Sequence, residues 1–297
     1  MRVFVTGASG FIGSAVVRNL LDAGHQVLGL ARSDASASAL AAIGATPHRG
    51  DLQDLPSLRS GAELSDGVIH TAFIHDFAKF KENCEIDRAV IETLGAVVAG
   101  TERPLVVTSG TGLLANAGRI TEADRTTPGA GHPRVASEEA AAAAVAKGAR
   151  VSVVRLPPSV HGVGDHGFVP LLIGLAREKG IAAYVGDGAN RWPAVHRLDA
   201  ADLFRLALEK GEADARYHGS AEDGVPFREI AGVIGRRLGL PVVSLSPEEA
   251  AGHFGWFAHF AAMDNPSSSD RTRQTLGWRP TAPGLIADLD QPAYFGS

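Results

Sequence analysis

One segment near the start of the chain, VFVTGASGFIGSAVVRNLLDAG, constrains the fold more than any other. An apolar run over 2–6 predicts a strand, and the apolar spacing over 12–23 predicts an amphipathic helix. Between them lie Gly7, Gly10 and Gly13. In a strand–turn–helix unit with this spacing, the first glycine makes the tight turn, the second lets the backbone approach a pyrophosphate, and the third lets the helix pack on the strand. The segment therefore predicts a dinucleotide-binding turn.

The rest of the first half of the chain continues this pattern. Short runs rich in Val, Ile and Leu alternate with longer helix-patterned segments, which is typical of βαβ units around a parallel sheet. We predict an α/β fold with a doubly wound parallel sheet. The further strands are predicted at 26–31, 67–72, 104–108 and 151–155, and the further helices at 35–43, 81–99 and 137–147.

The composition of the chain changes after residue 156. RLPPSVHGVGDHGFVP and YVGDGANRWPAVHRLD are rich in Gly, Pro and His, as expected for loops that carry a site beside a rigid sheet. We predict that residues 1–156 form the dinucleotide-binding domain and that residues 157–297 mostly form a smaller substrate-binding lobe. DAADLFRLALEKG predicts a helix in a segment near 195–220 that returns to the first domain.

Composition and charge exclude several classes of partner. The chain has 297 residues, is 45% apolar and 21% charged, and carries a net charge of -5, which is ordinary for a globular protein and does not favour nucleic acid or an anionic membrane. Cys84 is the only cysteine, so neither an intrachain disulfide nor a thiolate metal cluster can form. We find no leader pattern and no membrane-spanning run, and we expect a cytoplasmic protein.

The residues after the second predicted strand indicate which dinucleotide binds. A unit that binds NAD places a carboxylate there, which accepts a hydrogen bond from a ribose hydroxyl. Here Arg32 and Ser33 take that place and suit the 2′-phosphate of NADP(H). The alternative is that Asp34 contacts the ribose and Arg32 is an ordinary surface residue. We expect NADP(H) as the cofactor.

Several motifs in sequence order resemble those of the extended and atypical short-chain dehydrogenase/reductase superfamily, which includes NAD-dependent epimerase/dehydratases. The resemblance spans nearly the whole chain and implies a Rossmann-like domain that binds NAD(P), with a smaller C-terminal lobe that holds substrate over the nicotinamide. The motifs are TGASGFIG at 6–13, GDLQD at 50–54, VIHTAF at 68–73, VVTSGTG at 106–112, RLPPSVHG at 155–162, GDGANRWPAVHRLDAADL at 186–203 and LGWRPT at 276–281.

The glycine turn and the resemblance together predict the residues that hold the cofactor. Asp51 and Leu52 are expected at the edge of the adenine. The full predicted set is Gly7, Ser9, Gly10, Phe11, Ile12, Gly13, Arg32, Ser33, Asp51, Leu52, Thr71, Ala72, Phe73 and Pro157.

The catalytic pair of this superfamily is not found in the sequence. The resemblance implies a Ser or Thr and, on a later helix, a YxxxK pair whose Tyr exchanges the carbonyl proton while its Lys holds the ribose. Arg134 stands at the Tyr position and Glu138 at the Lys position, in RVASE. The three tyrosines of the chain all lie downstream, at positions 184, 217 and 294. Tyr-dependent chemistry is therefore in doubt, whereas cofactor binding is unaffected.

Other residues are candidates for the missing roles. Ser109 and Thr111 lie nearest the Ser/Thr position and can hydrogen-bond a carbonyl, or they satisfy backbone groups at a strand end. His75 and His161 can supply a proton or form a pocket wall. Arg134 can act only as a charge, because a guanidinium keeps its proton at neutral pH. Glu138 is interpreted as pairing with Arg134 or facing solvent.

A few residues are interpreted as structural. His196 matches a structural histidine of the superfamily. The spacing of four further polar residues fits no metal motif, so no metal site is expected; these residues are Asp165, His166, Asp199 and Asp202. The aromatic stretch HFGWFAHFAAM is more typical of a core than of a pocket.

These observations favour an NADPH-dependent reductase that transfers hydride to a ketone, imine or activated alkene of a small, fairly apolar substrate. One alternative is a catalytically silent NADP(H)-binding sensor or scaffold, and a second is a nucleotide-sugar epimerase or dehydratase. The helices predicted at 81–99 and 137–147 match those that pair in dimeric relatives, so we also expect a homodimer.

Overall fold

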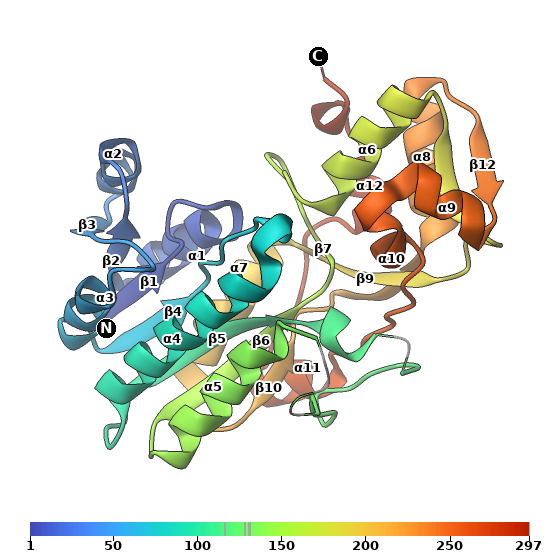
Figure 1. The fold of residues 1–297 in the computed structure, drawn as a ribbon. Coiled ribbons are helices and arrows are strands. Elements are labelled where there is room, and N and C mark those ends of the chain that lie inside the picture. Colours follow the sequence, from blue (N-terminus) through green and yellow to red (C-terminus); the bar gives the residue numbers. More distant parts are fainter. Residues whose placement is uncertain (116, 128, 130–131, 297) are drawn as a thin grey trace.

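The computed structural model describes residues 1–115, 117–127, 129 and 132–296. Its centre is a seven-stranded sheet with the order β10-β6-β5-β4-β1-β2-β3, in which every neighbouring pair is parallel (Figure 1). The α/β prediction is therefore confirmed. The strands are β1 Arg2–Thr6, β2 Gln26–Ala31, β3 Thr46–Arg49, β4 Gly67–His70, β5 Pro104–Gly110, β6 Arg150–Leu156 and β10 Arg216–His218.

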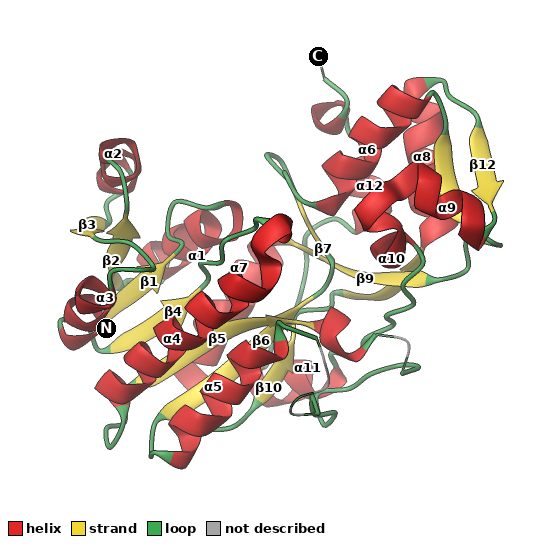
Figure 2. Cartoon of the chain, viewed as in Figure 1, coloured by secondary structure: helices red, strands yellow, loops and turns green. Residues whose placement is uncertain are grey.

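Helices cover both faces of this sheet (Figure 2). Alternate residues of β1 show why two layers form: Val3 and Val5 pack in the cluster with α1 and α7, whereas Phe4 packs in the cluster with α3, α4 and α5. A strand buried on both faces therefore reads as a continuous apolar run. The flanking helices are α1 Phe11–Asp22, α2 Asp34–Ala42, α3 Leu55–Glu63, α4 Phe80–Val98, α5 Val135–Ala146 and α7 Arg197–Lys210.

The five predicted strands and four predicted helices of the first half are confirmed, with ends shifted by at most two residues. The strand predicted over 67–72 ends earlier, at His70, where the chain turns towards the glycine loop. The sequence did not predict β3 or α3. The TPHR of β3 contains a proline and no apolar run, and LPSLRSGAE of α3 buries only Leu58, Gly61 and Ala62.

The second half of the chain contributes to both parts of the molecule. The helix predicted in DAADLFRLALEKG is α7, which packs on α1, and β10 extends the central sheet beside β6. The helix α11 Asp270–Leu276 contacts both α7 and β10. The segment near 195–220 therefore includes a strand that the sequence did not predict, β10. A second helix that the sequence did not predict, α11, returns to the central sheet from outside that segment.

The remaining elements build the C-terminal lobe, which has its own apolar core. A three-stranded sheet of order β11-β9-β7 and a parallel pair, β12 with β8, form its β-structure. The strands are β7 Ser159–His161, β8 Ala182–Val185, β9 Arg191–His196, β11 Glu222–Pro226 and β12 Val242–Leu245, and the helices are α6 Phe168–Lys179, α8 Phe227–Leu238, α9 Pro247–Phe254, α10 Ala258–Ala261 and α12 Leu285–Leu289.

The lobe meets the central sheet at the carboxyl end of β5. The Thr111 hydroxyl donates to Asn265 Oδ1 at 2.6 Å, and Asn265 Nδ2 donates to the Thr111 carbonyl at 3.1 Å. Both residues are buried. Ligands of open parallel sheets bind outside the carboxyl ends of the strands, so this junction is where a site is expected.

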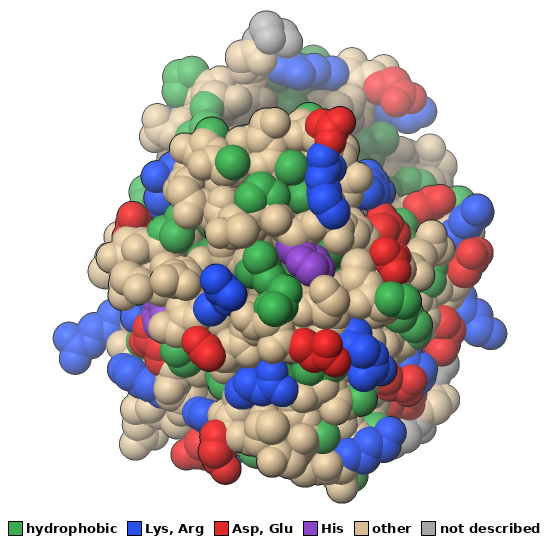
Figure 3. Space-filling model, turned by 90° about the vertical axis from the view of Figure 1, so that its left-hand side faces the viewer, with side chains coloured by type: hydrophobic (Ala, Val, Ile, Leu, Met, Phe, Trp, Pro, Cys, Tyr) green, Lys and Arg blue, Asp and Glu red, His purple; other side chains and the backbone are tan. Residues whose placement is uncertain are grey.

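The surface and helix lengths agree with the composition. No helix in the described part of the chain combines the length and apolarity needed to cross a membrane. On the face seen in Figure 3, Lys and Arg side chains are interspersed with Asp and Glu, and charges of one sign form no extended patch there.

The helices α4 and α5, which are predicted to pair in a homodimer, pack closely against each other through small residues, since a Cβ at Gly95 would lie 2.6 Å from that of Ala144. Homodimer formation stays a prediction.

Candidate active site

The glycine turn lies between β1 and α1 and is held by close backbone contacts. Gly7 has φ +67°, and a Cβ there would lie 2.8 Å from the Ala72 nitrogen. A Cβ at Gly13 would lie 1.9 Å from the Gly7 carbonyl oxygen, so only glycine fits. A Cβ at Gly10 would lie 3.2 Å from its nearest neighbour, the Gly7 carbonyl oxygen, and Gly10 itself is exposed. Gly7 and Gly13 therefore permit packing, while Gly10 keeps the approach to α1 open.

The N-terminus of α1 can accept an anion. Its N-cap is Gly10, and no side chain caps the helix, so the amides of its first turn are free to bind a phosphate. Arg197, at the start of α7, lies with its guanidinium carbon 5.1 Å from the centre of the Phe11 ring. A pyrophosphate at this turn would therefore meet both a helix N-terminus and a nearby cation.

The end of β2 carries the residues predicted to select the dinucleotide. Arg32 is exposed and makes no hydrogen bond or ion pair with any other residue that the structure describes. Ser33 is the N-cap of α2 and accepts from the Ser36 amide at 3.2 Å. The Asp34 carboxylate accepts a hydrogen bond from the Arg49 guanidinium. This pair uses one oxygen of an exposed carboxylate and leaves the other free, so the alternative in which Asp34 binds the ribose stays open.

The other predicted cofactor residues lie at the ends of neighbouring strands. Thr71 donates its hydroxyl to the Thr6 carbonyl at 2.7 Å, which places Thr71 and Ala72 directly beside the glycine turn. Asp51 and Leu52 follow β3, and the Asp51 carboxylate accepts from the Gln53 amide at 3.0 Å. Three further predicted cofactor residues differ in exposure: Ser9 is exposed in the glycine turn, Ile12 is half-buried in α1, and Pro157 is buried just after β6. All of the predicted cofactor residues follow carboxyl strand ends or begin α1, so they can line one groove.

Arg134 immediately precedes α5, and its guanidinium reaches the carboxyl ends of β4 and β5. It donates to the Asp87 carboxylate, to the Ser137 hydroxyl and, at 3.1 Å, to the Thr108 carbonyl. The guanidinium carbon of Arg134 lies 4.1 Å from the centre of the Phe73 ring. Hydrogen bonds on one side and an aromatic face on the other therefore fix the position of this cation.

Asp87 connects Arg134 to the glycine turn. His70 Nε2 donates to Asp87 at 2.9 Å, and its Nδ1 accepts from the Thr6 hydroxyl at 2.6 Å. Burial alone would raise the pKa of Asp87, but Arg134, His70 and Ser137 together hold it well below its usual range. Sequence reasoning missed Asp87. The sequence feature that could have revealed Asp87 is its position among the apolar residues of α4 that face the core, between Cys84 and Ile91, where a carboxylate is unusual.

Glu138 forms a buried ion pair with a second arginine. Arg155 donates to both Glu138 carboxylate oxygens at 2.7 Å, and the two side chains are 0% and 2% exposed. Burial would raise the pKa of Glu138, but the hydrogen bonds and charge of Arg155 outweigh it and keep the pKa below its usual value. His218 lies at 3.3 Å from Arg155, and burial, followed by that charge, lowers its pKa to about 4. The interpretation of Glu138 as paired with Arg134 or facing solvent is therefore wrong.

The two predicted hydroxyl donors are already engaged. Ser109 donates to Glu138 at 2.8 Å, and Thr111 donates to Asn265. Both are buried, so neither hydroxyl proton points freely into the groove. Ser109 therefore connects β5 to α5, and Thr111 connects the end of β5 to the lobe.

Two histidines lie near Arg134. The His75 ring lies 5.2 Å from that of Phe73, the same ring that Arg134 covers. Although an edge of His75 is exposed, desolvation by its surroundings and then the charge of Arg134 lower its pKa. His132, which sequence reasoning missed, accepts from the Arg134 amide through Nδ1 at 3.3 Å. His75 and His132 are thus two polar groups near the fixed cation.

His161 occupies a different environment. Its Nδ1 donates to Asp288 at 2.8 Å, its ring is 1% exposed, and its Nε2 has no hydrogen-bond partner in the described structure. Tyr294 also donates to Asp288, at 3.2 Å. His196 caps α7 through Nδ1, which accepts from the Leu198 amide. His161 therefore faces the interior of the lobe, and His196 has the structural position that its motif implied.

The remaining polar candidates act separately. The Asp165 carboxylate accepts from the Gly167 amide, and burial raises its pKa to about 6. Asp199 accepts from the amides of Thr281 and Ala282, both at 3.0 Å, and so fixes the late LGWRPT segment. His166 is exposed in the loop before α6, and Asp202 pairs with Arg205. Among the described residues, no group of three His, Cys, Asp or Glu side chains is placed to hold a metal ion.

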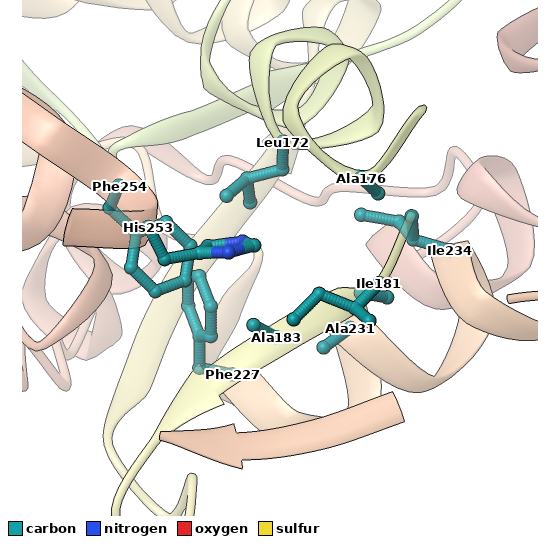
Figure 4. Close-up of a pocket in the computed structure, with 10 residues that line it drawn as sticks. Leu172, Ala176, Ile181, Ala183, Phe227, Ala231, Ile234, His253 and Phe254 are labelled. Carbon is teal, nitrogen blue, oxygen red and sulfur yellow. The ribbon is translucent and has the colours of Figure 1, made fainter. Parts of the chain in front are cut away.

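A small apolar pocket lies inside the lobe, away from the glycine turn. Its walls come from α6, β8, α8 and α9, and the His253 ring points into it between Leu172 and Phe227 (Figure 4). It contains none of the predicted site residues, so we assign it to the packing of the lobe. The predicted groove lies instead at the strand ends.

We predict that Gly10→Ala weakens NADPH binding by about tenfold without unfolding the protein. The added methyl group would lie 3.2 Å from the Gly7 carbonyl oxygen, a close contact that a shift of a few tenths of an ångström relieves, and it projects into the space that a pyrophosphate must approach. Calorimetric titration with NADPH measures the affinity, and thermal unfolding measures the stability. Gly232→Ala in α8, where a Cβ would contact no atom within 4 Å, is the control and should leave binding unchanged. Equal affinities for the two variants would contradict the assignment of the turn.

We predict that Glu138→Gln lowers the free energy of unfolding by about 3 kcal/mol at neutral pH, because it leaves the buried Arg155 charge unpaired. Urea denaturation measures the loss. The matched control is Glu139→Gln, the next residue, whose half-exposed pair with Arg88 should contribute less than about 1 kcal/mol.

The same pair predicts a pH dependence. The pKa of Glu138 in the folded protein lies below its ordinary value of 4.5, so the stabilisation is complete above that pH and is lost as the pH falls. The difference in stability between the wild type and Glu138→Gln should therefore narrow below about pH 4.5. A difference that stays constant or widens in acid would exclude this role for the ion pair.

Comparison with known proteins agrees with this geometry. Residues 3–218 match the family model described as the NAD dependent epimerase/dehydratase family. An uncharacterized protein of Schizosaccharomyces pombe is 53% identical over 99% of this chain and 100% of its own length. A sterol-4-alpha-carboxylate 3-dehydrogenase (decarboxylating) of Dictyostelium discoideum is 28% identical over 77% of this chain and 74% of its own.

Among solved structures, DesIV, a dTDP-glucose 4,6-dehydratase from Streptomyces venezuelae with NAD and TYD bound, has a TM-score of 0.79 at 23% identity, covering 99% of this chain and 97% of that one. At this identity the likeness establishes the fold alone. The family match extends over the glycine turn, β1 to β6 and the helix that carries Glu138. The chain therefore belongs to the NAD dependent epimerase/dehydratase family within the short-chain dehydrogenase/reductase superfamily, and its relatives support an oxidoreductase activity.

Proposed function

We propose that this protein is an NADPH-dependent reductase that transfers hydride to a ketone, imine or activated alkene of a small, fairly apolar substrate. The observation that carries the proposal is the Arg134 guanidinium, fixed beside the glycine turn at the position where the superfamily has its Tyr. A positioned cation stabilises the negative charge that develops on a carbonyl oxygen during reduction. Arg134 would thus stabilise the oxyanion, as the Tyr does in the superfamily, but it would not donate the proton.

Support for NADPH comes from Arg32 and Arg49 near the end of β2. Arg32 has no partner among the described residues, and Arg49 is more than half exposed while pairing with Asp34. Two guanidinium groups near one strand end suit a dianionic 2′-phosphate better than a ribose hydroxyl. The bound nicotinamide would supply the hydride, and the protein supplies orientation, charge and a proton.

We assign the proton to His75. Ser109 and Thr111 donate within the protein, whereas an edge of His75 is open on the loop after β4. His75 and Arg134 both contact the Phe73 ring, so we place the reacting carbonyl of the substrate near this ring, within reach of both groups. The reduction would be balanced with a hydride from NADPH adding to the carbonyl carbon and the His75 proton going to the oxygen, which gives the alcohol and NADP⁺. His75 would then regain a proton from solvent, and exchange of NADP⁺ for NADPH would restore the starting state.

The alternative of a silent NADP(H)-binding sensor also has an observation in its favour. Both hydroxyls near the Ser/Thr position are held by internal hydrogen bonds rather than directed at a ligand. Tight cofactor binding without any turnover would favour this alternative. The second alternative, a nucleotide-sugar epimerase or dehydratase, lacks a base at the Tyr position.

We predict that Arg32→Ala weakens NADPH binding by roughly tenfold to a hundredfold and changes NADH binding by less than about twofold, because only NADPH carries the 2′-phosphate. Fluorescence titration of both reduced cofactors measures the two affinities. Arg18→Ala, which removes an exposed arginine from the solvent side of α1, is the control. An equal loss for NADPH and NADH would refute the assignment of Arg32.

The activity itself is tested by NADPH oxidation with a panel of ketones, imines and enones. We predict turnover by the wild type and a fall in kcat of about a hundredfold or more in Arg134→Ala, because the developing oxyanion loses its cation. Cofactor affinity is measured in parallel, so that a binding defect is distinguished from a chemical one. Wild-type protein that binds NADPH tightly and oxidises none of it would overturn the proposal.

The same assay tests His75 through its pH profile. A general acid acts in its protonated form, and the pKa of His75 lies below its ordinary value of 6.5, since desolvation, Arg134 and His166 outweigh the hydrogen bond to the Phe73 backbone and the charge of Asp87. The value of kcat/KM should therefore rise as the pH falls from about 8 to about 6. His75→Gln should be slower and lack this slope, whereas His253→Gln, in the separate lobe pocket, should retain it.

A further inference from the structure

Aromatic side chains from three separate segments meet beside the candidate site. Phe77 lies just before α4, Phe168 begins α6, and Trp256 and Phe260 lie in the segment after α9. The Phe77 ring stacks on Trp256, with ring centres 4.7 Å apart and planes 27° apart, and lies 6.2 Å from Phe168 and 6.3 Å from Phe260. We call Phe77, Phe80, Trp256 and Phe260 the aromatic wall. It joins the start of α4 to the lobe, and Figure 1 shows α4 beginning on the side that faces the lobe.

The aromatic wall leads to Arg134 by successive ring contacts. Arg134 lies 4.1 Å above Phe73, whose ring centre is 6.1 Å from that of Phe80. Phe80 in turn stacks on Phe77 at 5.7 Å with an interplanar angle of 18°. A continuous aromatic surface therefore runs from the fixed cation to Trp256.

Trp256 is not a core residue, in contrast to the interpretation of its segment from sequence. Its neighbours Phe254 and Phe257 are 3% and 0% exposed and belong to the core of the lobe, whereas Trp256 is 54% exposed. Leaving so large an apolar ring in water is unfavourable, and its stacking partner covers only one side. The segment thus has a buried face that packs the lobe and one aromatic side chain left on the surface.

Two histidines lie at the aromatic wall, and a third lies beside Phe73, between the wall and Arg134. His75 lies 5.2 Å from Phe73, His132 lies 6.0 Å from Phe80, and His259 lies 5.8 Å from Phe260. Asp87 offsets part of the charge of Arg134, so this surface suits a neutral planar ligand with a polar oxygen better than a dianionic phosphate. Imidazole groups can hydrogen-bond a carbonyl at the edge of such a ligand.

We propose that the substrate is an aromatic or conjugated carbonyl compound whose planar group packs on Phe77 and Trp256, with its oxygen directed towards Arg134. This inference rests on the proposed function for the statement that this oxygen belongs to the reacting carbonyl. The ring of the ligand either extends the Phe77–Trp256 stack or takes the place of the indole against Phe77. Trp256 is then a residue that determines specificity and takes no part in the chemistry.

The test compares two ketones of the same skeleton, acetophenone and cyclohexyl methyl ketone. Their affinities are measured by calorimetry in the presence of NADP⁺, so that no reduction occurs, and their kcat and KM values are measured with NADPH. The wild type should bind acetophenone about threefold to tenfold more tightly than the saturated ketone. Trp256→Ala should abolish this preference, while Trp256→Phe, which keeps a stacking ring, should retain most of it.

A matched control and a second signal locate the ligand. Leu64→Ala removes an apolar side chain of equal exposure, 55%, at the end of α3 and should leave the preference unchanged. Because Trp192 and Trp278 are buried, quenching of the exposed tryptophan by acetophenone reports on position 256, and it should disappear in Trp256→Phe. Equal wild-type affinity for both ketones, or an unchanged preference in Trp256→Ala, would overturn the inference.

The two proposals fail in different ways. Preferential acetophenone binding that depends on Trp256, without NADPH oxidation, would support the aromatic wall as a ligand site and refute the reductase. Turnover of both ketones with no preference would support the reductase and refute the aromatic wall as its specificity element.

Discussion

The contact between Gly7 and Gly13 is the constraint on which the site depends. Only because neither residue carries a Cβ can α1 lie directly on the end of β1, with its free N-terminal amides at the sheet edge. From the same turn, Thr6, His70 and Asp87 form a hydrogen-bonded chain that ends at Arg134. The predicted cofactor groove and the fixed cation are thus parts of one buried network.

The first turns of α5 carry two charges with opposite uses. Arg134 is held at the strand ends with a side chain 13% exposed, while Glu138 is withdrawn into the sheet by Arg155. A buried glutamate without a counter-charge would be costly, and Arg155 on β6 provides that charge. Glu138, which the sequence predicts at the Lys position, therefore serves the stability of this protein, and Arg134, which it predicts at the Tyr position, lies where a ligand can approach it.

Much of the Rossmann-like half of the fold could be predicted, because its strands are buried on both faces and its helices end at glycines such as Gly24 and Gly148. The missed elements, β3, α3, β10 and α11, have weak apolar patterns and form through contact with elements already present. Of the site, the glycine turn and the group at the end of β2 could be read locally. The partners of Ser109, Thr111 and Glu138 could not, since those contacts join residues 29, 154 and 17 positions apart.

The sequence by itself determined the parallel sheet, the glycine turn and the identity of the residues at the Tyr and Lys positions, because each is a property of short segments and their periodicity. Only the tertiary structure decided which charges are paired. It turned Glu138 inward to Arg155, engaged both hydroxyls, and brought Trp256 against Phe77 from the other end of the chain. The physical reason is that hydrogen bonding and burial depend on which segments the sheet brings together, and the local pattern does not specify this.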